Sequence, residues 1–173
     1  MKIGMRIVHW HATDAASKEQ RQSFREIYAA YLSALAKCTD FDETFEAIIE
    51  RVVQECAWHG HKSYLVTLDG KPIGLTILGN WPNAFSRHDT YIQEFFILPE
   101  YQRNGYGTQA VEWIVNNGPV DGDISLYILP KNESAKMFWS MALGGLGYRD
   151  RFEDASIDAK TKEGFIFRYY TEQ

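Results

Sequence analysis

A buried strand that runs into a glycine-bearing loop and then into a helix is the feature that most limits how this chain can fold. Positions 91–98 are rich in aromatic and branched residues, and Pro99 ends that run. A polar loop with Gly105 and Gly107 follows and leads into a helix that we expect to begin at Thr108. The first turn of a helix leaves N–H groups without partners and carries the positive end of the peptide dipoles. Since glycine lets the backbone approach a phosphate closely, the order predicts an anion-binding site at this helix N-terminus.

Two other phosphate-binding motifs do not fit these glycines. A dinucleotide-binding fingerprint, G-x-G-x-x-G, needs a third glycine, and Ala110 occupies that position. A Walker P-loop is also absent. A plain glycine turn between a strand and a helix remains as the structural alternative.

Two segments resemble a known family. Residues 102–107, Gln-Arg-Asn-Gly-Tyr-Gly, match the Q/R-x-x-G-x-G/A motif of the GNAT superfamily of N-acetyltransferases. Residues 94–99 resemble the strand before that motif, in diamine (spermidine/spermine-type) acetyltransferases in particular. Residues 132–139 are similar to the family's N-x-x-A-x-x-F-Y helix. The resemblance covers about 91–148, and it implies acetyl-CoA (acetyl-coenzyme A) as the co-substrate.

The rest of the chain predicts alternating strands and helices of a single domain, residues 1–173, a length sufficient for one full core. Ser17 begins a capping box for a first helix, and Asp40 is expected to cap a second one. Asp69-Gly70 predicts a hairpin. The expected strands cover 5–10, 64–68, 72–78, 91–98, 124–129, 148–152 and 164–170, and a further helix follows Asn132.

This order, β-α-α-β-β-β-α-β-α-β-β, indicates a mixed α/β (α+β) fold with helices flanking a partly antiparallel central sheet. The resemblance implies a GNAT-like acyl-CoA N-acyltransferase fold, in which two neighbouring parallel strands splay apart and coenzyme A lies in the gap. In this sequence those strands would carry Glu94 and Tyr127.

The resemblance also implies which residues hold the co-substrate. Backbone amides of Phe96, Ile97 and Leu98 are expected to pair with the pantetheine arm as an added strand would. Loop amides are expected to cradle the pyrophosphate, and Asn132 and Phe138 to lie along the pantetheine. A plain helix N-cap is the alternative role for Asn132. The expected set is Phe96, Ile97, Leu98, Gln102, Arg103, Asn104, Gly105, Tyr106, Gly107, Thr108, Asn132 and Phe138.

Glu94 is the candidate catalytic residue. A free alkylamine has a pKa of about 10.4, so its attack on a thioester at neutral pH needs a base. Glu94 is the one acid inside its strand, and burial between Phe95 and Phe96 would raise its pKa toward neutrality. Polyamine-type enzymes have a glutamate where Gln93 stands here. Three roles therefore stay open for Glu94: base, anchor for a cationic substrate, or structural strand residue.

The usual general acid of the family is missing from its place. The family's helix motif ends on a tyrosine, and Trp139 occupies that position, with an indole N–H that cannot serve as an acid. Another group could protonate the thiolate, the thiolate could leave unprotonated, or the chain could lack activity. A Phe-Trp pair also occurs in one branch of the family.

The function indicated is acetyl transfer from acetyl-CoA to a primary amine of a small molecule or peptide by direct attack. A catalytically silent CoA-binding regulatory module and a transferase of another acyl group are the alternatives. The net charge of −5 argues against a nucleic-acid partner and weakly favours a cationic substrate. No apolar run reaches membrane-spanning length, no signal peptide is found, and Cys38 and Cys56 fit reduced thiols. A cytoplasmic protein without a membrane partner is expected, and the sequence leaves open whether it forms a homodimer.

No metal is expected either. Two His-x-His pairs lie on segments that do not converge in sequence, and solvated histidines explain them better. Acids near the second helix are explained mostly by the helix dipole, although they could also line the substrate mouth. The residues concerned are His9, His11, His59 and His61, the acids Asp40, Asp42, Glu43, Glu46 and Glu50, and the mouth candidates Tyr28, Tyr31 and Trp81.

Overall fold

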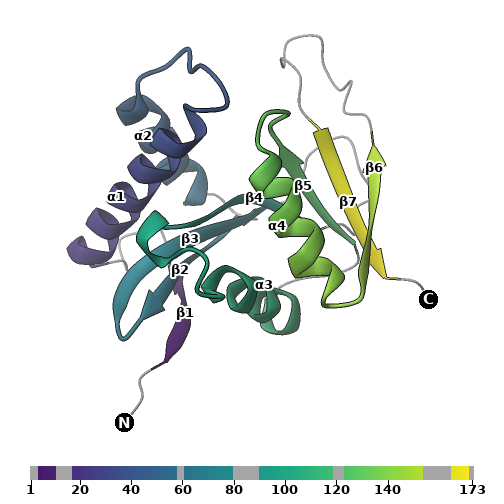
Figure 1. Ribbon diagram of the computed structural model, residues 1–173. Helices are drawn as coiled ribbons and strands as arrows, with labels where there is room; N and C mark the ends of the chain where they lie inside the picture. The colour runs from purple at the N-terminus through teal and green to yellow at the C-terminus, as the bar shows by residue number, and fades with distance from the viewer. Residues whose placement is uncertain are drawn as a thin grey trace.

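The computed structural model describes residues 4–10, 17–57, 61–79, 90–118, 123–153 and 165–171, and its strands form one seven-stranded sheet (Figure 1). The strand order is β1-β2-β3-β4-β5-β7-β6, and each neighbouring pair is antiparallel except β4 and β5. The order of elements confirms the predicted α+β arrangement. The elements are β1 (Met5–Trp10), α1 (Lys18–Leu35), α2 (Phe45–Cys56), β2 (Lys62–Leu68), β3 (Lys71–Gly79), β4 (Thr90–Ile97), the 3-10 turn η1 (Pro99–Tyr101), α3 (Tyr106–Asn117), β5 (Ile124–Ile128), α4 (Glu133–Gly144), β6 (Tyr148–Glu153) and β7 (Phe165–Thr171).

The helices cover the two faces of the sheet in pairs. The helices α1 and α2 lie together on one side, and α3 and α4 lie on the other (Figure 1). An apolar stripe on α1 packs against β3 and β4, with Phe24 and Tyr28 almost fully buried. On the opposite face, α3 and α4 bury Ile114 and Trp139 against β4 and β5. Each face therefore has its own core, as expected for a central sheet between helix layers.

Several local predictions are confirmed in atomic detail. Ser17 makes both hydrogen bonds of the capping box with Gln20. The Asp69-Gly70 turn has positive φ at both residues, 51° and 82°, which is the geometry that a two-residue hairpin favours. Asn132 caps α4 by accepting a hydrogen bond from the N–H of Ala135.

Two predicted helix starts are wrong. Thr44, not Asp40, caps α2, because the Oγ1 of Thr44 accepts the hydrogen bond from the N–H of Ala47, and the segment before Thr44 is non-helical. The helix α3 begins at Tyr106, two residues before the predicted start. Gly105 ends the loop there in the left-handed region, at φ 80°.

The strands β4 and β5 separate after a short parallel pairing. They are paired only from Thr90 to Ile92 of β4, while β4 itself continues to Ile97. On its other side, β4 carries a bulge against β3, because Ile77 pairs with Glu94 whereas Leu78 pairs with Ile92. Gln93 is thus the extra residue, and such a residue bends and twists its strand. The bend lies where the two strands part.

Candidate functional site

A cavity of about 290 Å³ lies where β4 and β5 separate. Both strands, α4, α1 and the segment after α1 contribute to its wall, so the parting of the sheet gives it lining from both helix layers. Among the described residues, its lining comprises Tyr31, Leu35, Thr39, Phe41, Tyr91, Ile92, Gln93, Glu94, Phe95, Leu126, Tyr127, Ile128, Leu129, Asn132, Ala135 and Trp139.

Glu94 lies in this cavity, with its carboxylate held from α1. The hydroxyl of Tyr28 donates a hydrogen bond of 2.8 Å to Glu94 Oε1. Burial raises the pKa of Glu94 to about 7, although hydrogen bonds from Tyr31 and Tyr28 act in the opposite direction by stabilising the carboxylate. A carboxyl with a pKa near neutrality can take up and release a proton at physiological pH, which is what a general base needs.

The bulge decides which way Glu94 faces. Residues two apart on a regular strand point to the same side of a sheet, but Ile92 packs in the core of α3 and α4 while Glu94 meets Tyr28 of α1. The extra residue Gln93 accounts for this change of side. If Gln93 were paired regularly instead, Glu94 would lie on the same face as Ile92 and would not meet the tyrosines of α1.

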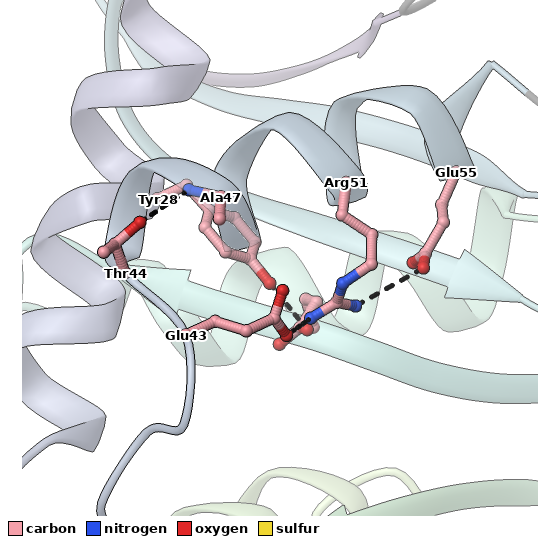
Figure 2. A network of polar contacts seen from close by, with 7 residues as sticks. Tyr28, Glu43, Thr44, Ala47, Arg51 and Glu55 are labelled. Atoms are coloured by element: carbon pink, nitrogen blue, oxygen red, sulfur yellow. Dashed lines mark hydrogen bonds and ion pairs between the residues drawn. The ribbon is translucent and has the colours of Figure 1, made fainter.

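A charged cluster formed by α2 and the residue before its N-cap lies beside this site. The guanidinium of Arg51 forms ion pairs with Glu43 at 3.1 Å and with Glu55 at 3.4 Å (Figure 2). Arg51 is half exposed, so the pairs add little to stability. The positive charge of Arg51 lowers the pKa of Glu94 and the negative charge of Glu55 raises it, both less than burial does.

The loop after β4 is held by its own side chains. Gln102 Nε2 donates to the carbonyl of Ile97 at 2.7 Å, and Asn104 Nδ2 donates to the carbonyl of Gln102 at 2.9 Å. Arg103 and Gly105 both have positive φ, 60° and 80°. These contacts fix the loop as it enters α3.

The N-terminus of α3 differs from those of the other described α-helices. Ser17, Thr44 and Asn132 cap α1, α2 and α4 with side chains, whereas Gly105 provides no side-chain cap to α3. The N–H groups of residues 106–108 precede the first intrahelical bond, which Gln109 makes to Gly105. A first turn of this kind favours an anion.

Gly107 has a packing role that the sequence did not reveal. A Cβ at this position would lie 3.0 Å from Cε2 of Phe138, so the side chain of α4 occupies the space beside the glycine. Phe138 also stacks on Phe95 of β4 at 5.5 Å between ring centroids. The glycine thus allows α3 and α4 to meet near the end of β4.

The backbone pattern of β4 bears on the predicted pantetheine contact. The N–H of Leu98 donates to the carbonyl of Ile73 on β3, so it is engaged on the β3 side. The carbonyl of Glu94 also faces β3, where Thr76 Oγ1 donates to it at 2.9 Å. The backbone N–H and C=O groups of successive residues point alternately to the two sides of a strand. The backbone groups of Phe96 therefore face β3 as well, and the amides of Phe95 and Ile97 face the gap between β4 and β5. The sequence did not single out Phe95, although this alternation could have indicated it.

Trp139 is part of the wall where the family's motif has tyrosine. It is only 6% exposed and packs edge-on against Phe95 and Phe138, each at 5.1 Å between centroids. Tyr31, Tyr91 and Tyr127 are the tyrosines among the described lining residues. Burial raises the pKa of Tyr127, which keeps its phenol protonated at neutral pH.

Several of the remaining predicted residues are not among the described lining of the cavity. Asp40, Asp42 and Glu46 are exposed. His11, His59 and Trp81 lie outside the described residues, as does the side chain of His9. In the described part of the chain, no group of three or more histidine, cysteine, aspartate or glutamate side chains could hold a metal ion, and no helix is long and apolar enough to cross a membrane.

The comparisons with known proteins agree with this geometry. The model of the Acetyltransferase (GNAT) family matches residues 21–144, more than half of the chain. No curated protein matches the sequence. Among solved structures, an acetyltransferase from Thermus thermophilus is similar with a TM-score of 0.68 and 15% identity, over 98% of this chain and 97% of that one.

Two similar structures contain ligands. A PaiA N-acetyltransferase from Thermoplasma acidophilum in complex with coenzyme A has a TM-score of 0.66 and 16% identity, over 96% of this chain and 99% of that one. A spermidine N-acetyltransferase from Vibrio cholerae in complex with CoA and spermine has a TM-score of 0.59 and 14% identity, over 96% of this chain and 94% of that one. At these identities, the likeness establishes the fold.

Proposed function

The chain belongs to the acetyltransferase (GNAT) family, and from this premise we propose that it transfers an acetyl group from acetyl-CoA to a primary amine of a small molecule or peptide by direct attack. The observation that carries the proposal is the carboxyl of Glu94, which has a pKa of about 7 and lines the cavity between β4 and β5. Residues 1–173 would form one such domain. The two free cysteines, Cys38 and Cys56, fit a reducing, cytoplasmic setting.

The residues present fit the co-substrate. The first turn of α3 has no side-chain cap, and Gly105 has open space beside it, with its nearest neighbour, Gln109 Nε2, 3.6 Å from an added Cβ. The exposed Arg103 adds a positive charge to this loop. Residues 102–108 would hold the pyrophosphate, and the amides of Phe95 and Ile97 would pair with the pantetheine, with Asn132 and Phe138 beside it. When bound, acetyl-CoA supplies an activated acetyl thioester.

Glu94 would act as the base. Above pH 7 its carboxylate is mostly ionised and can accept a proton from the acceptor's ammonium group, which leaves a neutral amine able to attack. The hydrogen bonds from Tyr28 and Tyr31 hold the carboxylate in one orientation. An amide N–H of Phe95 or Ile97 on the gap side could stabilise the oxyanion.

Tyr127 is the proposed source of the proton for the leaving thiolate. It lines the cavity from β5, across the gap from the strand that carries Glu94. Trp139 cannot serve, because an indole N–H is not an acid of useful pKa. Tyr127→Phe should therefore lower kcat more than it raises the KM for acetyl-CoA.

A silent CoA-binding module is the second candidate, and Trp139 at the place of the usual acid is the observation that favours it. Two measurements separate the candidates: calorimetry with coenzyme A, and thiol release from acetyl-CoA with a panel of amines. Glu94→Gln should lower kcat by about 10²–10⁴ while coenzyme A affinity is kept. The matched control is Glu112→Gln, which neutralises an exposed acid on α3. Binding of coenzyme A without turnover of any amine or any other acyl thioester would support the silent module.

A further inference from the structure

We propose that the acceptor is a compact monoamine with an apolar or aromatic body and no carboxylate. Its ammonium group would lie on Glu94, and its body against Tyr31, Leu35 and Phe41. The inference rests on the proposed acetyltransferase function and concerns the same cavity. It narrows the acceptor from any primary amine to one chemical class.

The charges of the residues that line the cavity disfavour an acceptor with a carboxylate. Among the described lining residues, Glu94 is charged, and none is lysine, arginine or histidine. Arg51 acts on Glu94 electrostatically but is already engaged by Glu43 and Glu55. Among the described lining residues, the carboxylate of such an acceptor would meet no cation and would lie near the carboxyl of Glu94. Such an uncompensated charge should disfavour binding by roughly 10²–10³-fold.

The other lining residues are largely apolar or aromatic, and they indicate what the body of the acceptor is like. Tyr31 and Leu35 of α1 and Phe41 of the following segment form the wall opposite α4, and Tyr91 and Tyr127 add two further rings. Aromatic faces attract a nearby ammonium group as well as apolar carbon. The cavity volume of about 290 Å³ is at the small end of ligand sites, which range from roughly 300 to 1,000 Å³, and the proposed acetyl-pantetheine would take part of it. The space left for the acceptor therefore favours a short amine.

A polyamine is the natural competitor, since one similar structure was solved with spermine. The acids that adjoin lining residues in sequence are Asp40, Asp42 and Glu133, and all three are exposed. Glu43 and Glu55, beside Glu94, are already paired with Arg51. An exposed ion pair is screened by water and salt, so a second ammonium group would gain less than about tenfold there. The extended chain of a polyamine would also leave the aromatic wall largely uncovered.

Three acceptors test the inference with the wild-type protein. Phenethylamine and phenylalanine share one body and differ by a carboxylate, and spermidine represents the polyamines. With saturating acetyl-CoA, thiol release and product mass should give a kcat/KM for phenethylamine about 10²–10³-fold above that for phenylalanine and at least about tenfold above that for spermidine. If the kcat/KM for phenylalanine or for spermidine equals that for phenethylamine, the inference fails while the proposed function stands. If no amine is acetylated, both fail.

A charge introduced into the lining gives an independent test. Leu35→Arg places a cation at the cavity near the C-terminal end of α1, where the helix dipole tolerates it. It should reduce the preference for phenethylamine over phenylalanine by about tenfold or more. Ala36→Arg adds the same charge at the neighbouring exposed position and should keep the wild-type preference. An unchanged preference in a folded Leu35→Arg protein that still binds coenzyme A would overturn the charge argument.

Discussion

Replacing Tyr28 by phenylalanine should move the pH dependence of acetyl transfer while leaving the fold in place. The substitution removes only a hydroxyl, but that hydroxyl donates to Glu94 at 2.8 Å from a side chain that is 2% exposed. The hydrogen bond stabilises the ionised form of Glu94, so its loss raises the pKa of the carboxyl. If Glu94 is the base, the raised pKa lowers its ionised fraction at neutral pH.

The size of the effect follows from the bond that is lost. A hydrogen bond to a charged group contributes about 1.5–3 kcal/mol, and one pH unit corresponds to about 1.4 kcal/mol. Tyr31 still donates to Glu94, so we expect a value near the lower end. The acid limb of the kcat/KM profile should then move up by about one pH unit. At pH 7 the ionised fraction would fall from about one half to about one tenth, and activity by about fivefold.

The measurement is kcat/KM from pH 5.5 to 9.5 for the best acceptor, followed by thiol release at saturating acetyl-CoA. Tyr148→Phe is the control, because Tyr148 lies on β6 and is not among the described lining residues. Activity of Tyr28→Phe should recover at high pH, which a merely destabilised protein would not show. An acid limb that stays in place, or moves down, would refute the assignment of this limb to Glu94.

Three further outcomes are expected. Thr108→Glu, exposed in the first turn of α3, should weaken coenzyme A binding about tenfold or more in calorimetry, whereas Asn116→Glu near the other end of that helix should not. Gly107→Ala should lower the free energy of unfolding by about 1–3 kcal/mol in urea titrations through its contact with Phe138, whereas Gly144→Ala, with open space around it, should not. The melting temperature should fall as pH rises from about 4.5 to 7, because folded Glu94 holds its proton more tightly than the unfolded chain does, and Glu94→Gln should flatten this slope.

The sequence could predict what depends on local order. Ser17 and Asn132 act as helix caps because a cap needs only a side-chain acceptor and the N–H groups within the next turn. The Asp69-Gly70 hairpin is similarly local. Glu94 was found because a lone acid in an apolar strand must be buried or functional, and the structure gives it the raised pKa that burial predicts.

Contacts between distant segments could not be predicted in the same way. Tyr28 and Glu94 are 66 positions apart, and in the sequence Tyr28 is indistinguishable from any aromatic residue on the buried stripe of a helix. Gln93 gives no sign that it is an extra residue, because a bulge is defined by the partner strand and not by the residue itself. The cap of α2 was misassigned for a different reason: Asp40 and Thr44 are both residue types that cap helices, and in the structure it is Thr44 Oγ1 that accepts from the N–H of Ala47.

The bulge links the fold of this chain to its proposed chemistry. Pairing between β4 and β5 stops at Ile92, and the next residue is the extra one, Gln93. One inserted residue thus marks the place where the strands part and also turns Glu94 toward Tyr28 and Tyr31. Because side chains alternate along a strand, a β4 that kept Gln93 in regular pairing would place the side chain of Glu94 on the same face as Ile92, toward α3 and α4 and away from both hydroxyl groups. The position of the bulge therefore determines which helix layer the proposed base meets.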